Sequence, residues 1–441
     1  MGRAVLGVVV YIVVALCAVV LVLATGPETD HGFIYELGKC LALAGIMILA
    51  LQPILASRFK AMERPYGQDV LIRFHKHMGI FAGVALLLHP LLLALGGGGL
   101  VLLLSLDVPW YILLGKAGLL VLVIQVIVSL MHARIGFLTF ERWRLGHDMA
   151  GPLVLVLVFV HSFFAGRDIQ GSWWWPLWPA ALLVAAGVFV YHRIIRPWRL
   201  GKHPWKVSDV KQEAADVWTV KLEPPPDKGR YDYHPGQFHF VTFHRDRGLP
   251  EEEHHWTISS SPAQQGFVTS TIKELGDFTR TIGKTKAGDT ATVHGPFGRF
   301  SHVLHPEEKD LVFIAGGIGI TPLISMLRYM RDKGSDHRIL FLYGNPDQNS
   351  ILFRKELAEI EQGSAPDLRV VHVLSDPKEG WDGETGLIDR ARIEKYAGEV
   401  IEAKTFYLCG PPGLVEAAQR ELAKAGVEDS RIHVEIFSFL D

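Results

Sequence analysis

Long apolar runs dominate the first 200 residues of this 441-residue chain, whereas the remainder alternates apolar and polar positions as soluble proteins do. Six runs are long enough to cross a hydrocarbon core, which takes roughly 20 helical residues. We predict spanning helices at 4–24, 34–56, 75–95, 109–131, 149–165 and 177–195. The first is interpreted as a retained span, because its apolar core is too long for a signal peptide and no clear cleavage site follows it. The pattern therefore predicts a six-helix transmembrane bundle within residues 1–200.

The charges between these runs predict an orientation. Cytoplasmic loops of membrane proteins are enriched in Lys and Arg. The segments around the ends of the second, fourth and sixth spans are basic, while the other loops carry mainly acidic charge. The basic residues are Arg58, Lys60, Arg64, Arg73, Lys76, Arg134, Arg142, Arg144, Arg193, Arg196, Arg199, Lys202 and Lys206. We expect a multi-pass protein of the cell membrane, in contact with lipid, with both termini in the cytoplasm.

Two of the spans carry histidine pairs with the same separation. His75 and His89 lie fourteen residues apart, and so do His147 and His161. On a helix this is just under four turns and a rise of about 21 Å, so both members of a pair face nearly the same way. Two such helices running in one direction would place His75 beside His147 and His89 beside His161. Haem iron takes axial histidine, so the spacing predicts an inner haem at the first site and an outer haem at the second.

Other polar and aromatic residues in this half have competing interpretations. Any one intramembrane histidine could instead be a satisfied packing residue. His77 is rotated off the ligand face, and His132 lies at a helix end without a suitably spaced partner. A tryptophan cluster near the start of the sixth span is predicted to be an interfacial belt rather than a set of electron carriers. It comprises Trp173, Trp174, Trp175 and Trp178.

Small and basic residues near the histidines also leave alternatives open. Gly79, Gly83 and Gly151 could make room for a porphyrin, or could simply let helices pack closely. Arg73 and Arg144 could neutralise haem propionates, or could extend toward lipid headgroups.

Residues 203–305 are predicted to form a small antiparallel β-barrel. Apolar and polar positions alternate in segments such as 216–221 and 237–242, and Gly and Pro mark turns. The strand at 255–260 could hold a flavin and its ribityl chain through hydroxyl and backbone groups, or could be a plain strand edge. The segment 276–279 could open a short helix whose amino end binds an anion, or could be only a capped helix.

Residues 306–441 are predicted to form a doubly wound α/β domain with a parallel sheet. The strand 311–315 runs into a glycine-rich turn at 316–322 and then a helix at 323–331. Glycines let a backbone approach a pyrophosphate, although this turn lacks the full G-x-G-x-x-G spacing. Further strands are predicted at 338–343, 369–374 and 405–409. The turn 409–413 follows the last of these, where open α/β sheets bind ligands or simply turn into a helix.

Charge and cysteine usage constrain the partners little. The formal net charge of -2 gives no reason to expect nucleic acid. Three cysteines, Cys17, Cys40 and Cys409, cannot form a disulfide framework and have no iron–sulfur or zinc spacing. They suit a reducing cytoplasm for the soluble half.

Taken in order, these segments resemble the NADPH oxidase and ferric reductase superfamily, most closely the bacterial NADPH oxidases. Six spans with paired histidines on the third and fifth match its membrane domain. Segments similar to its flavin motifs are His255-Trp256-Thr257-Ile258-Ser259-Ser260, where Trp256 replaces a Pro, Gly276-Asp277-Phe278-Thr279, and the turn 295–298. Segments that match its nucleotide motifs are Gly316-Gly317-Ile318-Gly319-Ile320-Thr321-Pro322 and Cys409-Gly410-Pro411-Pro412.

The resemblance implies a ferredoxin-reductase-like soluble half and a set of cofactors: FAD, two b-type haems and NADPH or NADH. Glu435-Ile436-Phe437 is similar to the family's end signature, in which a terminal aromatic stacks on the isoalloxazine. Phe437 is the first choice for that aromatic and Phe439 the second, while a buried terminal strand is the alternative. Cys409 and Phe437 are therefore expected to be catalytic as well as cofactor-binding.

One departure from the family concerns the choice of nucleotide. After residues 342–344 the family often has an Arg for the 2′-phosphate of NADPH, but here Asn345-Pro346-Asp347 follows. Asp347 would repel that phosphate, and Arg354 could compensate. No calcium-binding loop and no Pro-rich tail are visible in the sequence, so no regulatory subunit is implied.

We therefore expect an enzyme that moves electrons from cytoplasmic NAD(P)H through FAD and two haems to dioxygen outside, forming superoxide. Extracellular ferric chelate is the alternative acceptor for the same arrangement. A haem-bearing membrane subunit that feeds a partner enzyme is a third hypothesis.

Overall fold

The computed structural model describes residues 2–25, 32–136, 138–245, 248–398 and 400–436, which fall into two compact units. The first unit is Met1–Trp198 and the second is Arg199–Asp441. The predicted division at residue 200 lies close to this boundary. Phe437 and Phe439 lie outside the described residues, so their predicted role at the flavin remains a prediction.

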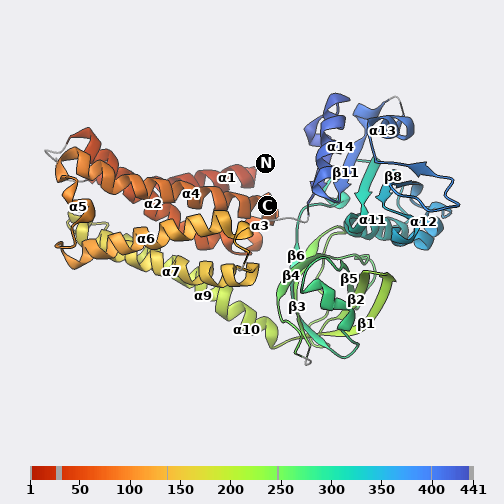
Figure 1. Cartoon of the computed structure of the whole chain (residues 1–441), viewed down its shortest axis with the longest axis horizontal. Helices are drawn as coiled ribbons and strands as arrows, with labels where there is room; N and C mark the ends of the chain where they lie inside the picture. The colour runs from red at the N-terminus through yellow and green to blue at the C-terminus, as the bar shows by residue number, and fades with distance from the viewer. Residues whose placement is uncertain (1, 26–31, 137, 246–247, 399, 437–441) are drawn as a thin grey trace. The chain divides into compact units, whose positions relative to one another are not determined.

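Within the described residues, six helices are long and apolar enough to cross a membrane. They form the bundle of the first unit (Figure 1). Their bounds are α1 (Gly2–Thr25), α2 (Phe33–Ala56), α4 (Gln68–Leu93), α6 (Trp110–Met131), α7 (Phe140–Ala165) and α9 (Leu177–Val190). Many of their large apolar side chains are exposed, particularly along α1, as expected of a lipid-facing surface.

Two helices begin earlier than their apolar patterns predict. α4 starts at Gln68 rather than at 75, and α7 starts at Phe140 rather than at 149. The first turns of α7 are polar, so hydropathy does not reveal them. Thr139 caps this helix, with its hydroxyl oxygen accepting a hydrogen bond from the backbone N–H of Arg142 at 3.4 Å. His75 and His147 therefore lie inside their helices and not at their ends.

Shorter elements connect and extend the spans. They are α3 (Lys60–Tyr66), η1 (Ala94–Gly98), α5 (Val101–Leu104), η2 (His132–Arg134), α8 (Arg167–Gln170), η3 (Tyr191–Ile195) and α10 (Arg196–Gly201). In the bundle α2 packs mainly against α4, and α6 packs mainly against α7. The two helices that carry the histidines, α4 and α7, therefore pack mainly against different neighbours, α2 and α6.

The amino-terminal part of the second unit is the predicted antiparallel barrel. Its strands are β1 (Trp205–Ala214), β2 (Val217–Glu223), β3 (Phe238–His244), β4 (Glu253–Thr257), β5 (Val268–Lys273) and β6 (Thr290–Phe297). Their order is β4-β3-β6-β1-β2-β5. The chain just beyond β4 pairs with β5 through the Ile258–Ser270 bridge and a hydrogen bond from Ser259 N–H to Thr269 O of 2.8 Å. These contacts close the sheet and leave its apolar positions inside.

The rest of the second unit is a parallel six-stranded sheet between two helical layers. The strands are β7 (Asp310–Gly316), β8 (Arg338–Asn345), β9 (Asp367–Leu374), β10 (Glu384–Thr385), β11 (Thr405–Cys409) and β12 (Ile432–Glu435). They lie in the order β10-β9-β8-β7-β11-β12. The main helices are α11 (Ile320–Lys333), α12 (Arg354–Glu361), α13 (Arg390–Ala397) and α14 (Pro412–Lys424).

The alternation along β7 explains why both faces of this sheet are covered. Leu311, Phe313 and Ala315 share a buried cluster with α11 and α12. Val312 and Ile314 face the other way, into a cluster with α13 and α14. A strand buried on both faces reads as a continuous apolar run, which is the pattern that predicted it. Since the order reverses between β7 and β11, the carboxyl ends of these two strands form the switch point where such sheets bind ligands.

Candidate cofactor sites

The structure brings His75 of α4 and His147 of α7 together in the interior of the bundle. Their ring centroids lie 6.0 Å apart with the planes inclined at 68°. Both residues are half-buried. An imidazole from each of two helices, aimed into one shared space, is the donor set that an axially ligated haem iron takes.

Side chains of α6 surround the inner pair. His147 Nδ1 lies 3.3 Å from Gln125 Nε2 and 3.2 Å from Ser129 Oγ. Ser129 Oγ also accepts a hydrogen bond from Trp143 Nε1 at 3.3 Å. Gln125 Oε1 is buried without a partner among the described residues. Turning the Gln125 amide over would place this oxygen against an Nδ1–H of His147 and would leave Nε2 of that ring as the ligand atom.

The outer pair, His89 and His161, is held by main-chain carbonyls instead. His89 Nδ1 lies 3.0 Å from Gly38 O, and His161 Nδ1 lies 2.8 Å from Tyr111 O. A carbonyl can only accept, so each Nδ1 must carry the proton and each Nε2 keeps its lone pair. Both side chains are partly buried within the bundle. The outer pair is therefore fixed in the tautomer that ligates a metal.

The glycines near the inner pair leave open space rather than close helix contacts. A Cβ built on Gly79 would meet nothing nearer than Gln52 Oε1 at 3.8 Å, and one on Gly151 nothing nearer than Gln125 Nε2 at 3.9 Å. A Cβ on Gly83 would make an ordinary contact with Val126 at 3.4 Å. Helix packing therefore does not require glycine at these positions. The donor set, the orientation of the rings and this room fit two haems held by His75 with His147 and by His89 with His161.

Histidines outside the pairs have local roles. His77 is exposed, and its Nδ1 lies 2.8 Å from the carbonyl oxygen of Arg73 in its own helix. His132 bonds to Ser129 O at 3.0 Å and stacks on Trp143 at 4.3 Å between centroids. Arg73 forms an exposed ion pair with Asp69 at 2.9 Å.

The predicted tryptophan belt needs correction. Trp173 and Trp175 are exposed, as an interfacial belt requires, but Trp174 and Trp178 are only 2% and 3% exposed. Trp174 Nε1 donates to Thr25 Oγ1 at 3.0 Å and Trp178 Nε1 donates to Ser162 Oγ at 2.9 Å. Trp174 therefore joins the turn before α9 to α1, and Trp178 joins α9 to α7. Four neighbouring tryptophans look alike in sequence, and only helix packing distinguishes the two kinds.

In the barrel, the predicted flavin segment alternates between two environments. Trp256 packs inward against Phe243 and Phe278, with centroid separations of 5.5 and 6.0 Å. His255 lies on the other side of β4, with Phe238 and Phe240 both 5.9 Å away. Thr257, which ends the strand, is buried. Of this strand, the His255 side carries partly exposed aromatic surface, from His255 and Phe240, on which a flavin ring could lie.

Ser259 and Ser260 do not offer hydroxyls to a flavin, contrary to our prediction. They are 0% and 2% exposed. Ser259 Oγ lies 2.9 Å from Thr269 Oγ1, and Ser260 Oγ lies 2.9 Å from Tyr233 Oη. Their carbonyls accept hydrogen bonds from α11, with Arg328 Nη1 to Ser259 O at 2.6 Å and Ser325 Oγ to Ser260 O at 2.7 Å. Both serines therefore join the barrel to the nucleotide domain.

The predicted anion site at 276–279 also differs from expectation. These residues precede a six-residue 3₁₀ helix, η4 (Thr279–Lys284), and its nearby amides are occupied locally. The N–H of Gly276 donates to Thr279 Oγ1, and the N–H of Phe278 donates to Asp277 Oδ1, both at 2.8 Å. The Phe278 side chain is buried in the barrel core. A pyrophosphate would have to displace these side-chain contacts, which a turn motif in the sequence cannot reveal.

The two nucleotide motifs meet at the switch point. Ala315 of β7 pairs with Cys409 of β11, so the turns that follow both strands lie side by side. A Cβ on Gly410 would lie 2.9 Å from Gly316 N, and one on Gly316 would lie 2.8 Å from Pro411 Cδ. Gly317 has φ +52, and its carbonyl accepts a hydrogen bond from Tyr343 Oη at 3.0 Å. Gly316, Gly317, Gly319, Gly410 and Pro411 are thus brought together, and the partly exposed turn 317–318 presents backbone for a dinucleotide.

Three other predicted residues of these motifs contribute only packing. Thr321 and Pro322 are buried, and Thr321 Oγ1 donates to Ile318 O at 3.0 Å. Cys409 is fully buried. Burial, followed by the nearby Glu435 carboxylate, raises the pKa of the Cys409 thiol well above its usual value. A chemical role for a Cys409 thiolate is therefore not supported, and the side chain packs in the core beneath the turn.

The predicted repulsion of a 2′-phosphate by Asp347 is weaker than its sequence suggests. Its carboxylate accepts hydrogen bonds from the N–H groups of Asn349 and Ser350 and lies 3.1 Å from Lys378 Nζ. Lys378 and these local hydrogen bonds lower the pKa of Asp347. Arg354 is exposed at the start of α12. Cations therefore accompany the acidic residue at this end of the sheet.

Three family models match consecutive parts of the chain. A ferric reductase like transmembrane component matches residues 41–190, an oxidoreductase FAD-binding domain matches 204–302, and an oxidoreductase NAD-binding domain matches 313–420. The chain belongs to the NADPH oxidase and ferric reductase superfamily. The predicted superfamily and fold class are confirmed. The chain thus combines a ferric-reductase-like transmembrane domain with FAD-binding and NAD-binding oxidoreductase domains.

Similar proteins cover the soluble half. The glycine betaine monooxygenase reductase subunit of Chromohalobacter salexigens is 30% identical over 54% of this chain and 65% of its own length. NADH-cytochrome b5 reductase 2 of Rattus norvegicus is 32% identical over 39% of this chain and 72% of its own length. A flavohemoglobin from Malassezia yamatoensis with bound FAD and heme has 15% identity and a TM-score of 0.50 over 95% of this chain and 98% of its own, a likeness of fold alone.

The sequence missed several residues of the ferric-reductase domain that position the histidines. A Cβ on Gly115 of α6 would lie 2.6 Å from Nδ1 and 2.7 Å from Cγ of His161, so only glycine leaves room for that ring. Ser129, Gln125 and Gln52 surround the inner pair. The available signal was polarity, because glutamine and serine inside apolar spans are costly unless they have partners. No comparable signal marks Gly115.

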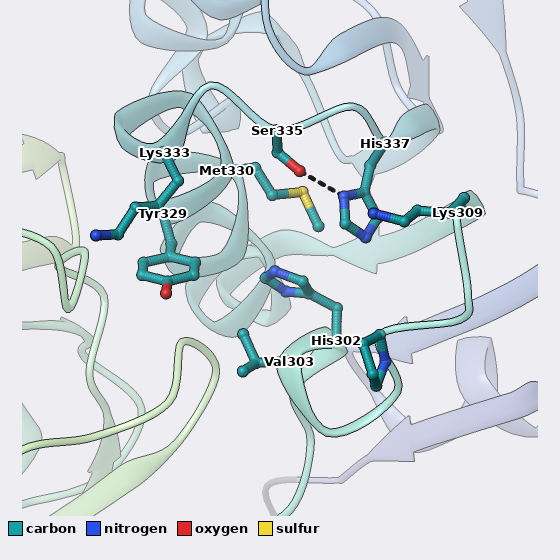
Figure 2. A pocket seen from close by; sticks show the side chains of 9 residues that line it. His302, Val303, Lys309, Tyr329, Met330, Lys333, Ser335 and His337 are labelled. Carbon is teal, nitrogen blue, oxygen red and sulfur yellow. Dashed lines mark hydrogen bonds between the residues drawn. The ribbon is translucent and has the colours of Figure 1, made fainter.

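A pocket of about 240 Å³ lies elsewhere in the nucleotide domain (Figure 2). It lies at the amino ends of β7 and β8, the edge of the sheet opposite the glycine-rich turn. Its lining includes His302 and His337, whose rings are 5.4 Å apart. Burial and the neighbouring His337 lower the pKa of His302 to about 3, so that ring is neutral. Because the pocket is at the wrong edge of the sheet, we do not assign it to the dinucleotide.

The barrel and the nucleotide domain are joined through Arg328 of α11. Besides Ser259 O, this guanidinium binds Glu356 of α12 through two hydrogen bonds of 2.9 and 2.6 Å. Burial alone would raise the pKa of Glu356, but Arg328 and Arg331 outweigh it and lower the pKa below its usual value of 4.5. The contribution of this ion pair to stability is therefore complete above that value and is lost as the pH falls through the lowered pKa.

Proposed function

We propose that this protein transfers electrons from cytoplasmic NAD(P)H, through FAD and two b-type haems, to dioxygen on the outer side of the membrane, and releases superoxide. One NAD(P)H supplies two electrons, so two dioxygen molecules become two superoxide ions and one proton is released. The observation that carries the proposal is the placement of one histidine of each predicted pair on α4 and the other on α7, with the rings of the inner pair 6.0 Å apart.

The chain's own residues have separable tasks in this proposal. FAD, when bound, converts a two-electron hydride donor into a source of single electrons, which haem iron accepts one at a time. The turns at 316–319 and 409–411 hold the dinucleotide by backbone approach, and the His255 side of β4 offers aromatic surface to the flavin. Each histidine pair provides an imidazole from two helices. A haem held by two imidazoles would have no open coordination site on its iron, so the acceptor would be reduced without binding the iron.

The basic segments at the ends of α2, α6 and α9 support a cytoplasmic second unit and an outer location for His89 and His161. Lys378, which lies 3.1 Å from Asp347, offsets the negative charge of that carboxylate, and the exposed Arg354 supplies a further cation for NADPH as donor. The architecture of the family leaves ferric chelate as the competing acceptor.

A parallel acceptor assay on the purified full chain tests the proposal. NADPH and NADH oxidation would be followed with added FAD and oxygen, with and without ferric chelate, and superoxide would be measured as cytochrome c reduction that superoxide dismutase inhibits. We expect chelate-independent turnover with two superoxide ions per nucleotide. Chelate-dependent turnover with little superoxide would instead make the protein a ferric-chelate reductase. Negligible turnover would favour a haem subunit that feeds a partner enzyme.

A further inference from the structure

Three potential metal ligands lie together at the amino edge of the parallel sheet, away from every residue assigned above. His305 and Glu308 belong to the segment that leads from the barrel into β7, and His433 belongs to β12. One ligand atom from each lies within 4.8 Å of the other two. All three side chains are partly buried, with exposed fractions of 31%, 12% and 18%.

The separations match the edges of a metal coordination shell. Glu308 Oε1 lies 2.9 Å from His433 Nε2 and 3.7 Å from His305 Nδ1. In a tetrahedral zinc site with bonds of about 2.1 Å, neighbouring ligand atoms are about 3.4 Å apart. The two separations from Glu308 bracket this value, and the ligand atoms of His305 and His433 lie within 4.8 Å of each other, so side-chain rotations of up to about 1–1.5 Å would bring all three atoms into a common shell.

A second residue fixes the carboxylate. Tyr407 Oη donates a hydrogen bond to Glu308 Oε2 at 2.8 Å, which leaves Oε1 directed toward the two histidines. Ligating carboxylates are commonly oriented in this way by a hydrogen-bond donor that does not itself touch the metal. The tyrosine ring also packs against His433, with centroids 4.5 Å apart.

We propose that His305, Glu308 and His433 form a binding site for a divalent transition-metal ion such as Zn²⁺. Two imidazoles and one carboxylate favour Zn²⁺ and its transition-metal neighbours over Mg²⁺ or Ca²⁺, which prefer oxygen ligands. Three protein ligands leave a fourth position for water. The ion would tie the segment between the barrel and β7 to β12, the last described strand of the chain.

Zinc uptake by the full-length protein in detergent tests this site. The wild type and a Glu308→Gln variant would be stripped with a chelator, equilibrated with Zn²⁺ alone and freed of unbound metal by gel filtration. Glutamine keeps the shape of the side chain but removes its charge. We expect the wild type to retain one more Zn²⁺ per chain than the variant. Equal retention would overturn the proposal.

Three further variants separate ligation from folding. Tyr407→Phe should weaken Zn²⁺ binding roughly 10- to 100-fold without abolishing it, as loss of an orienting partner does. His305→Gln removes a ligand whose side chain lies 3.7 Å from Glu308 and whose ring packs on His433 at 4.4 Å between centroids, so it should lose the bound zinc. The unfolding temperature of the zinc-free variant reports any effect on β12 itself. The matched control is Glu251→Gln, whose carboxylate lies 3.1 Å from the single histidine His244. Zinc should raise the unfolding temperature of the wild type and the control but not of the His305 variant; the same rise in all three would contradict the site.

Discussion

The inner and outer histidine pairs of the membrane unit lie on the same two helices but are held by different kinds of partner. Main-chain carbonyls at Gly38 and Tyr111 fix the outer pair. In the inner pair, His147 depends instead on the side chains of Gln125 and Ser129. A main-chain partner cannot be removed by substitution, whereas a side-chain partner can. Substitution of a partner can therefore change the hydrogen bonding of the inner pair but not that of the outer pair.

The largest effect should come from removing an outer ligand. His161→Ala should abolish haem binding at the outer site and acceptor reduction, while flavin binding persists in the other unit. Haem absorbance per protein measures this directly. The exposed His77→Ala is the control and should keep both haems. Two haems in the His161 variant would show that the residues are paired wrongly.

A smaller effect is expected when the outer ring is displaced rather than deleted. Gly115→Ala would place a Cβ within 2.6–2.8 Å of three His161 ring atoms, so the ring must move away from the Tyr111 carbonyl. Loss of an orienting partner typically weakens metal affinity roughly 10- to 100-fold. Haem retention during dilution measures the effect. Gly187→Ala, which meets nothing within 4 Å, should retain haem normally; a matching loss there would remove the special role of Gly115.

The inner site can be tested through its open space. Gly151→Ala should lower haem loading at the inner site, because the added methyl group fills room that the porphyrin would use. The haem-free bundle should be unchanged or more stable by up to about 1 kcal/mol, since alanine favours a helix over glycine. Haem content and thermal unfolding of the haem-free protein distinguish the two effects. A destabilised haem-free bundle with full haem loading would show that this glycine serves helix packing.

The smallest effect should follow from removing one side-chain hydrogen bond to His147 of the inner pair. Ser129→Ala removes one partner of His147 Nδ1 while Gln125 remains 3.3 Å away. One hydrogen bond contributes about 1 kcal/mol, equivalent to a shift on the order of tens of millivolts in a one-electron couple. Redox titration should show this shift in one haem only. Shifts of equal size in both haems would contradict separate anchoring of the two pairs.

The sequence revealed those features that depend on local periodicity. Fourteen-residue spacing predicted that His75 and His89 share one helix, and His147 and His161 another, because helix geometry converts the spacing directly into a shared face; the structure has these residues on α4 and α7. The apolar run 311–315 likewise predicted a strand buried on both faces.

Features that depend on contacts distant in sequence were not predictable. Gly115 is special only because α6 packs against the His161 ring, forty-six positions along the chain. Ser259 and Ser260 match a flavin motif, yet their hydroxyls are hydrogen-bonded to Thr269 and Tyr233 within the barrel. A motif records which residues occur together, but the tertiary fold decides which of their atoms face a ligand.

The burial of Cys409 has a consequence for durability. Of the three thiols in the chain, this is the one in the second unit, and the sheet encloses it completely. Oxidants attack cysteines whose thiols are exposed and easily ionised to thiolates, and the Cys409 thiol is neither exposed nor easily ionised. Oxidants that reach the second unit would therefore leave the nucleotide-binding turn free of sulfenic acid and mixed-disulfide damage.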